Sequence, residues 1–326
     1  MTRVIEAIRL RPLLSSAFPS PNAQGLDSLY LRGVPRTLQD SRSYDGVIKK
    51  TSGLDSAQVN ILSNPVYSGG TSATGTRYND REVILTLGSS DVRGLRSHIQ
   101  KLMGMTSRKP LELAIDLYSE LENSVYTVTA ECFIKNLAAP IFDSETSIEL
   151  TLNCPKPYFE GVRRSTVGTP KTEPEAKEGA FRRVRNGNVR YFYFTPALDD
   201  LSQNMSYKTP VSVSFSFPWK SAMGIKRFKM IDIHGSALEA TVKDPAFYKQ
   251  QVQAGGRNVT FKVNSLDKTF ESTHKSYFDF RVTGGWPESL PLAESLAVEV
   301  EIEDSSYDYT PEAFTGFSYT PRMVGV

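Results

Sequence analysis

The chain has 326 residues, of which 39% are hydrophobic and 23% charged, a length that suits two domains and a composition that excludes wholesale disorder. Its 38 basic and 36 acidic side chains leave a net charge of +2, so charge alone predicts no strong nucleic-acid binding. Charged residues interrupt the apolar run at residues 4–11, and no apolar stretch is long enough to span a bilayer, so we expect neither a signal peptide nor membrane insertion.

The dominant pattern along the chain is strict alternation of apolar and polar residues. This period of two is typical of strands with one face in a core and the other in water. β-Branched and aromatic residues fill the same stretches, as pleated surfaces favour. The expected strands include residues 83–87, 126–134, 148–154, 211–217 and 298–302.

One segment has the spacing of a helix. Between residues 91 and 103 the apolar positions are Val92, Leu95, Ile99, Leu102 and Met103. These offsets predict an amphipathic helix that packs across a sheet, with Ser90 as its N-cap and Gly104 at its end.

Two segments have the composition of loops. Residues 64–79 are rich in Gly, Ser and Thr and are typical of a mobile loop or a hairpin tip. Residues 161–179 are polar and lack either period, which indicates a linker or long excursion. The expected fold is mainly β: an N-terminal β-sandwich-like domain with one helix at residues 1–160, a linker or excursion at 161–187, and a C-terminal β-sandwich at 188–326.

The sequence offers little chemistry. His98, His234 and His274 have no Cys or His at metal-ligand spacing, and motifs for zinc proteases, serine hydrolases and phosphate loops are absent. For Cys132 and Cys154, which lie in alternating stretches, we favour two buried thiols over a disulfide or a metal site. We therefore expect no catalytic residue, no metal and no cofactor, and a protein that is not an enzyme.

Aromatic residues give further candidate contacts. Residues 191–194 alternate Tyr and Phe, so one face of this strand belongs to a core and the other can meet a partner. Trp219 and Trp286 lie in loop-like sequence, where an indole ring can stack on a saccharide. The alternative, which we favour, is that each Trp covers the end of a sandwich.

An ordered series of motifs over residues 53–160 resembles the distal tail protein family of long-tailed bacteriophages. The series begins with Gly53-Leu54-Asp55, the glycine-rich loop and the stretch from Arg77 to Leu87. It continues with the amphipathic helix, the strands at 110–115 and 126–132, and the strand at 148–154 that is followed by Pro155-Lys156-Pro157-Tyr158-Phe159.

The resemblance implies a structural virion protein, made in the host cytoplasm, that forms a hexameric ring at the tail tip. The ring would join the tail tube protein to the tail hub or tip protein. The N-terminal domain would close the ring, so that residues 1–160 suffice, and a projecting hairpin would clasp the neighbouring subunit. The C-terminal domain would be a galectin-like or carbohydrate-module-like sandwich, and the alternative function is adhesion to a host saccharide through it.

The glycine-rich loop and the stretch after it are the candidate subunit interface. A flexible segment beside a strong strand can extend as a hairpin, and arginine side chains there can form charge-assisted hydrogen bonds with a partner carboxylate. The candidates are Gly69, Gly70, Arg77, Tyr78 and Arg81. The alternative is that both arginines are solvated charges at a strand edge.

Overall fold

The computed structural model describes residues 3–13, 28–33, 43–55, 59–65, 71–105, 110–120, 123–138, 147–168, 171–172, 181–194, 209–232, 237–273, 280–286, 288–289, 296–307 and 314–324. The chain divides into two compact units. Unit 1 comprises Met1–Gly161 and Met323–Val326, and unit 2 comprises Val162–Arg322. The last residues of the chain therefore belong to the first unit.

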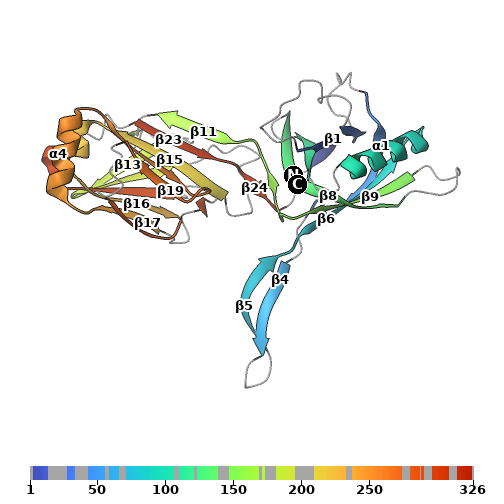
Figure 1. The fold of residues 1–326 in the computed structure, drawn as a ribbon, viewed down its shortest axis with the longest axis horizontal. Coiled ribbons are helices and arrows are strands. Elements are labelled where there is room, and N and C mark those ends of the chain that lie inside the picture. Colours follow the sequence, from blue (N-terminus) through green and yellow to red (C-terminus); the bar gives the residue numbers. More distant parts are fainter. Residues whose placement is uncertain are drawn as a thin grey trace. The chain divides into compact units, whose positions relative to one another are not determined.

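Unit 1 combines strands with the helix α1 (Val92–Met105) (Figure 1). Its described strands are β1 (Arg3–Pro12), β2 (Leu29–Arg32), β3 (Gly46–Ser52), β4 (Val59–Pro65), β5 (Thr71–Tyr78), β6 (Arg81–Gly88), β7 (Leu111–Ser119), β8 (Ser124–Ala138), β9 (Ser147–Cys154), β10 (Phe159–Glu160) and, after unit 2, β24 (Arg322–Met323). Nine of them form one sheet in the order β24-β10-β8-β7-β1-β2-β3-β6-β9.

This sheet closes on itself as a barrel of seven strands. The long strand β8 pairs with β7 along residues 124–132 and with β9 along residues 133–138, so β7 and β9 lie at successive parts of the same strand. The barrel runs β8-β7-β1-β2-β3-β6-β9, and β10 and β24 are added beside β8. The prediction of a mainly β fold is confirmed, whereas unit 1 is a barrel instead of the expected sandwich-like domain. The physical reason is that β8 pairs with both β7 and β9, which closes the strands into one sheet.

Alternate side chains of each strand point into the barrel and fill it. The residues with no exposed surface include Ile8, Leu10, Leu31, Val83, Leu85, Leu87, Leu113, Ile115, Val128, Leu150 and Leu152. The helix α1 buries Leu95, Ile99 and Leu102, as its spacing predicts, and contacts β9. Its N-terminus is capped by Asp91, whose Oδ1 accepts from the Gly94 backbone N–H at 2.8 Å, and not by the expected Ser90.

The strands β4 and β5 form an arm that is separate from the barrel sheet. They pair antiparallel from Val59↔Tyr78 to Pro65↔Thr71, with a register shift between Leu62 and Ser63. Among the described strands, each of the two pairs only with the other. Figure 1 shows them as a two-stranded ribbon. Residues 71–78, part of the segment expected as a mobile loop or hairpin tip, form strand β5 of this arm, and residues 66–70 lie outside the described residues.

Unit 2 consists of two open sheets and short helices. Its described strands are β11 (Arg164–Gly168), β12 (Lys171–Thr172), β13 (Phe181–Asn186), β14 (Val189–Phe194), β15 (Thr209–Phe217), β16 (Ile225–Asp232), β17 (Ala237–Val242), β18 (Val259–Asn264), β19 (Thr269–Ser272), β20 (Phe280–Gly284), β21 (Glu288–Ser289), β22 (Leu296–Ile302) and β23 (Phe314–Tyr319). Its described helices are α3 (Trp219–Ala222), α4 (Pro245–Gly255) and the 3-10 turn η1 (Ser305–Tyr307).

The two sheets of unit 2 share one core. One sheet runs β11-β23-β15-β18-β19, with β21 paired to β15, and the other runs β12-β13-β14-β22-β16-β17-β20. Aromatic rings from both sheets meet inside: Phe192 of β14 lies 5.1 Å from Phe215 of β15, and Phe228 of β16 lies 5.7 Å from Phe261 of β18, between ring centroids. Two sheets around a common core agree with a sandwich, and the galectin-like detail stays a prediction.

The segment expected as a linker carries strands. Within residues 161–187, β11 pairs with β23, β12 pairs with β13, and β13 pairs with β14. These strands are rich in Arg, Thr and Ser, so their sequences lack the apolar alternation by which the other strands are found. β11 depends on the distant strand β23, whereas β12 and β13 pair with strands close by in the sequence.

Leu150 provides a test of the barrel interior. Its side chain has no exposed surface, and its backbone pairs with Leu85 of β6 and Leu137 of β8. We expect Leu150→Ala to lower the free energy of unfolding by about 2–5 kcal/mol, because the change leaves a cavity. Glu149→Ala, at the exposed neighbouring position, is the matched control and should cost less than about 0.5 kcal/mol. Equal losses in denaturant titrations would contradict this assignment of faces.

Candidate functional site

The end of the barrel is organised around a buried arginine. Arg81, the first residue of β6, is 2% exposed. Its Nη1 donates to the carbonyl oxygens of Gly53 at 3.2 Å and Leu54 at 3.0 Å, and its Nη2 donates to those of Pro157 at 2.9 Å and Val324. We call these four hydrogen bonds the Arg81 clasp.

The segments in the clasp come from distant parts of the chain. Gly53 and Leu54 follow β3, Pro157 precedes β10, and Val324 follows β24. The Phe159 ring of β10 adds a cation–π contact, with the guanidinium carbon 4.6 Å from the ring centroid. The clasp thus joins the residues before β10, after which the chain leaves unit 1, to Val324 after β24, where the chain has returned to unit 1.

The first part of the clasp depends on a glycine. Gly53 has a φ of +80°, and a Cβ at this position would lie 1.9 Å from the carbonyl oxygen of Glu82. Both the left-handed backbone and the close approach require glycine. The turn that follows β3 therefore brings the carbonyls of Gly53 and Leu54 to the guanidinium.

The electrostatics of the clasp suit a structural role. Burial lowers the pKa of the Arg81 guanidinium, and the negative charges of Cys154 and Asp55 act in the opposite direction. The four acceptors of the clasp are neutral backbone oxygens, which use the planar set of donors of an arginine without the need for a buried carboxylate.

Arg81 therefore has a different position from the one that the sequence predicts. We expected its side chain at a subunit interface, and the structure places it inside unit 1, where its Nη1 and Nη2 donate to backbone carbonyls of the same chain. A signal for this position exists in the sequence. Arg81 is in phase with Val83, Leu85 and Leu87, whose side chains are all buried, so the alternation of β6 points it inward.

The other candidate interface residues lie on or next to the arm. Arg77 and Tyr78 are the last residues of β5, with backbones paired to Asn60 and Val59. Gly69 and Gly70 lie outside the described residues, between β4 and β5 in the chain. The structure therefore brings Arg77 and Tyr78 together on one strand and separates both from the buried Arg81.

The two tryptophans pack against the core of unit 2. Trp219 begins α3 and Trp286 follows β20, and each is a partly buried side chain against the shared core. That each of them covers the end of a sandwich stays a prediction. His234 and His274 lie outside the described residues, and His98 of α1 has its Nδ1 at 3.3 Å from Asp45 Oδ1.

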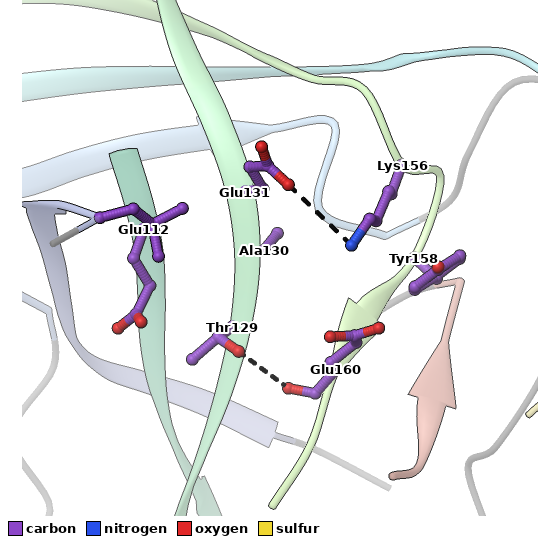
Figure 2. Close-up of a pocket in the computed structure, with 8 residues that line it drawn as sticks. Glu112, Thr129, Ala130, Glu131, Lys156, Tyr158 and Glu160 are labelled. Carbon is purple, nitrogen blue, oxygen red and sulfur yellow. Dashed lines mark hydrogen bonds and ion pairs between the residues drawn. The ribbon is translucent and has the colours of Figure 1, made fainter. Parts of the chain in front are cut away.

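A small polar cavity lies in unit 1 beside β8, with a volume of about 220 Å³. Figure 2 shows its walls. The lining residues are Leu13, Glu112, Thr129, Ala130, Glu131, Lys156, Tyr158 and Glu160. Lys156 Nζ lies 3.9 Å from Glu131 Oε2, and Arg11 Nη2 lies 2.7 Å from Glu112 Oε1. Each of these two carboxylates is paired with a cation.

The described residues show no further candidate for chemistry. They contain no group of three or more His, Cys, Asp or Glu side chains arranged to hold a metal ion. In the same part of the chain, no helix combines the length and hydrophobicity needed to cross a bilayer.

Comparison with known proteins identifies phage tail structures. No family model matches the chain. No curated protein matches it either. The solved structure of the SPP1 Dit (gp 19.1) protein, described as a paradigm of the hub adsorption apparatus in phages that infect Gram-positive bacteria, has a TM-score of 0.45 and 11% identity, over 85% of this chain and 93% of that chain.

Two structures of the phage P2 baseplate in its activated conformation, with Ca and with Sr, give TM-scores of 0.37 and 0.36 at 9% and 8% identity over the full length of both chains. The chain is similar to phage hub and baseplate proteins. This is the class that its sequence motifs resemble. Each TM-score is below 0.5, and we therefore rest the functional proposal on the chain's own residues.

Proposed function

We propose that the protein is a structural component of the tail tip of a long-tailed bacteriophage, in which copies of unit 1 close a hexameric ring. The ring links the tail tube protein to the tail hub or tip protein. The observation that carries the proposal is the arm of β4 and β5 on a closed barrel. The motif series at residues 53–160, which resembles distal tail proteins, supports the same function.

The arm supplies sheet edges that the barrel itself lacks. In the closed barrel, each of the seven strands has a neighbour on both sides. Among the described strands, β4 and β5 each pair only with the other, so one edge of each carries backbone donors and acceptors that no described strand pairs. An isolated two-stranded hairpin is marginally stable in water. Contact with another chain would give these edges partners and stabilise the arm.

A ring follows if the arm of one copy contacts a different surface of the next. Such contacts are heterologous, and they make a closed ring when the rotation between copies closes. Arg77, Tyr78, Gly69 and Gly70 remain the proposed interface residues, because they belong to or adjoin the arm. Arg81 has no place in this interface, since its guanidinium is buried in the clasp.

The remaining parts of the proposal follow from the same function. A ring that DNA passes through should not bind DNA strongly, and the net charge of +2 is compatible with this. The protein acts through shape and contacts, without catalysis or a cofactor. It is made in the host cytoplasm and resides in the virion, and unit 2 contacts other tail proteins.

Adhesion to a host saccharide through unit 2 is the second candidate function. One observation favours it: the half-buried rings of Tyr191 and Tyr193 on β14 lie 6.2 Å apart and within 13° of parallel. The intervening Phe192 points into the core, so the two tyrosines share the opposite face of the sheet. Glycan binding by Tyr191→Ala and Tyr193→Ala variants would separate this function from tail assembly.

Removal of the arm tests the proposal. We expect the full chain to assemble to six times its mass of 36.3 kDa, and a variant with residues 58–78 replaced by a short Gly-Ser linker to remain a monomer. Mass photometry measures both. A matched control replaces residues 266–268, an exposed turn of unit 2, and should still assemble. Assembly of the variant without the arm would contradict the role of the arm.

A further inference from the structure

The two cysteines of the chain meet at the seam where the barrel closes. β8 pairs with β9 from Phe133↔Asn153 onward, so the antiparallel register places Cys132 directly opposite Cys154. Both side chains have no exposed surface, and both thiols are free. In the same layer, Cys132 pairs with Leu111 of β7, and Cys154 pairs with Arg81 of β6.

The geometry of this pair fits a disulfide. Directly opposed residues of an antiparallel pair have Cα atoms about 4.5–5.5 Å apart. Disulfides span Cα distances of about 4.4–6.8 Å. The two side chains also point to the same side of the sheet, into the barrel, so a bond between the sulfurs needs no rearrangement of the strands.

The surroundings make the two thiols unequal. A hydrogen bond from the Cys132 thiol lowers the pKa of Cys154, burial raises it, and the positive charge of Arg81 lowers it. The same hydrogen bond, together with burial, raises the pKa of Cys132. Cys154 is therefore the sulfur that ionises first and reacts first with an oxidant.

We propose that Cys132 and Cys154 are a redox pair that forms an intramolecular disulfide with a small peroxide oxidant. The Cys154 thiolate attacks one oxygen of hydrogen peroxide and breaks the O–O bond, which gives a sulfenic acid and, after proton transfer, water. The Cys132 sulfur then attacks the Cys154 sulfur and releases a second water. Two thiols and one peroxide thus give one disulfide and two waters, with both sulfurs oxidised and both peroxide oxygens reduced.

The disulfide would lock the barrel covalently. It would join β8 to β9 next to the register shift between Ile134 and Asn136, where the seam pairing is irregular. The crosslink would close the loop of residues 133–153 and restrict the unfolded chain. This inference does not depend on the proposed function, since it concerns the stability of unit 1 in reducing and oxidising surroundings.

Peroxide treatment of the full chain tests the pair. We expect thiol labelling in denaturant to fall from two sites per chain to none, and dithiothreitol to restore both. Peptide mapping should recover a linked peptide that contains both cysteines, and thermal unfolding of unit 1 should shift to higher temperature in the oxidised sample. The linked peptide from the wild-type chain decides the chemistry even if a cysteine variant does not fold.

Cys132→Ala and Cys154→Ala are the matched variants. In each variant, the remaining cysteine should still be labelled after mild peroxide treatment, or it should be oxidised without forming a crosslink. Neither variant should gain thermal stability on this treatment. Peroxide-treated wild-type chain that keeps both thiols, that carries only sulfinic or sulfonic acids, or that is crosslinked between chains would overturn the proposal.

Discussion

Replacement of Arg81 by methionine is expected to lower the free energy of unfolding of unit 1 by about 3–5 kcal/mol. Methionine fills much of the space, but the carbonyl oxygens of Gly53, Leu54, Pro157 and Val324 lose their donors. Each buried acceptor without a donor costs about 1–3 kcal/mol before the chain relaxes. Arg81→Lys should recover part of the loss, because an ammonium is a single point of charge and cannot serve four separated carbonyls.

The two units can be followed separately in this measurement. Both tryptophans of the chain, Trp219 and Trp286, belong to unit 2, so Trp fluorescence reports on that unit alone. Hydrogen exchange at amides of β6 and β9 reports on unit 1. We expect Arg81→Met to speed up hydrogen exchange at the amides of β6 and β9. The unfolding transition that Trp fluorescence reports for unit 2 should stay unchanged.

Arg11→Met is the matched control for the arginine change. Arg11 forms an exposed ion pair with Glu112, and its side chain is 56% exposed. Its replacement should cost no more than about 1 kcal/mol. Equal effects of the two substitutions on the exchange in unit 1 would show that the clasp has no special role.

The second large effect is expected on removal of the C-terminal segment. A chain that ends at Glu160 lacks β24, which pairs with β10, and the Val324 carbonyl of the clasp. It also loses the Met323 side chain, which has no exposed surface in unit 1. Loss of a buried methionine side chain alone costs about 2–5 kcal/mol. Residues 1–160 alone should therefore be poorly folded, in contrast to the expectation from the sequence that they suffice for the ring.

Excision of unit 2 provides the comparison for this prediction. In the excised variant, a flexible linker replaces residues 162–321, so the chain keeps β10, β24 and Val324. Circular dichroism should show a cooperative thermal transition for this variant and a much lower or broad transition for the chain that ends at Glu160. Similar melting of the two chains would mean that the C-terminal segment contributes little to unit 1.

Local features of the fold are predictable from the sequence because their causes are local. Alternation places the buried faces of β6, β9, β15 and β22 correctly, and the spacing of Leu95, Ile99 and Leu102 gives the helix. The exact cap of α1 is less predictable, since Ser89, Ser90 and Asp91 are all good capping types. For the arm, the Gly-, Ser- and Thr-rich composition of residues 64–79 predicts a loop or hairpin tip, but it does not reveal that residues 71–78 form a strand.

Long-range pairings are the part that the sequence does not reveal. The alternation of β8 is the same whether it pairs with one strand or with two, so a barrel and a sandwich look alike in sequence. The return of residues 323–326 to unit 1 depends on partners some 160 positions earlier in the chain. Arg81 is an intermediate case. The alternation in β6 places its side chain on the buried face, but its charge suggests a surface position.

Electron microscopy of the purified full-length protein tests the ring most directly. We predict six-fold rings for the wild-type chain and for the variant in which a linker replaces unit 2, with the arm of each copy against its neighbour. The variant without residues 58–78 should show no rings. Isolated monomers of the wild-type chain, or rings that persist without the arm, would contradict assembly through unit 1 and its arm.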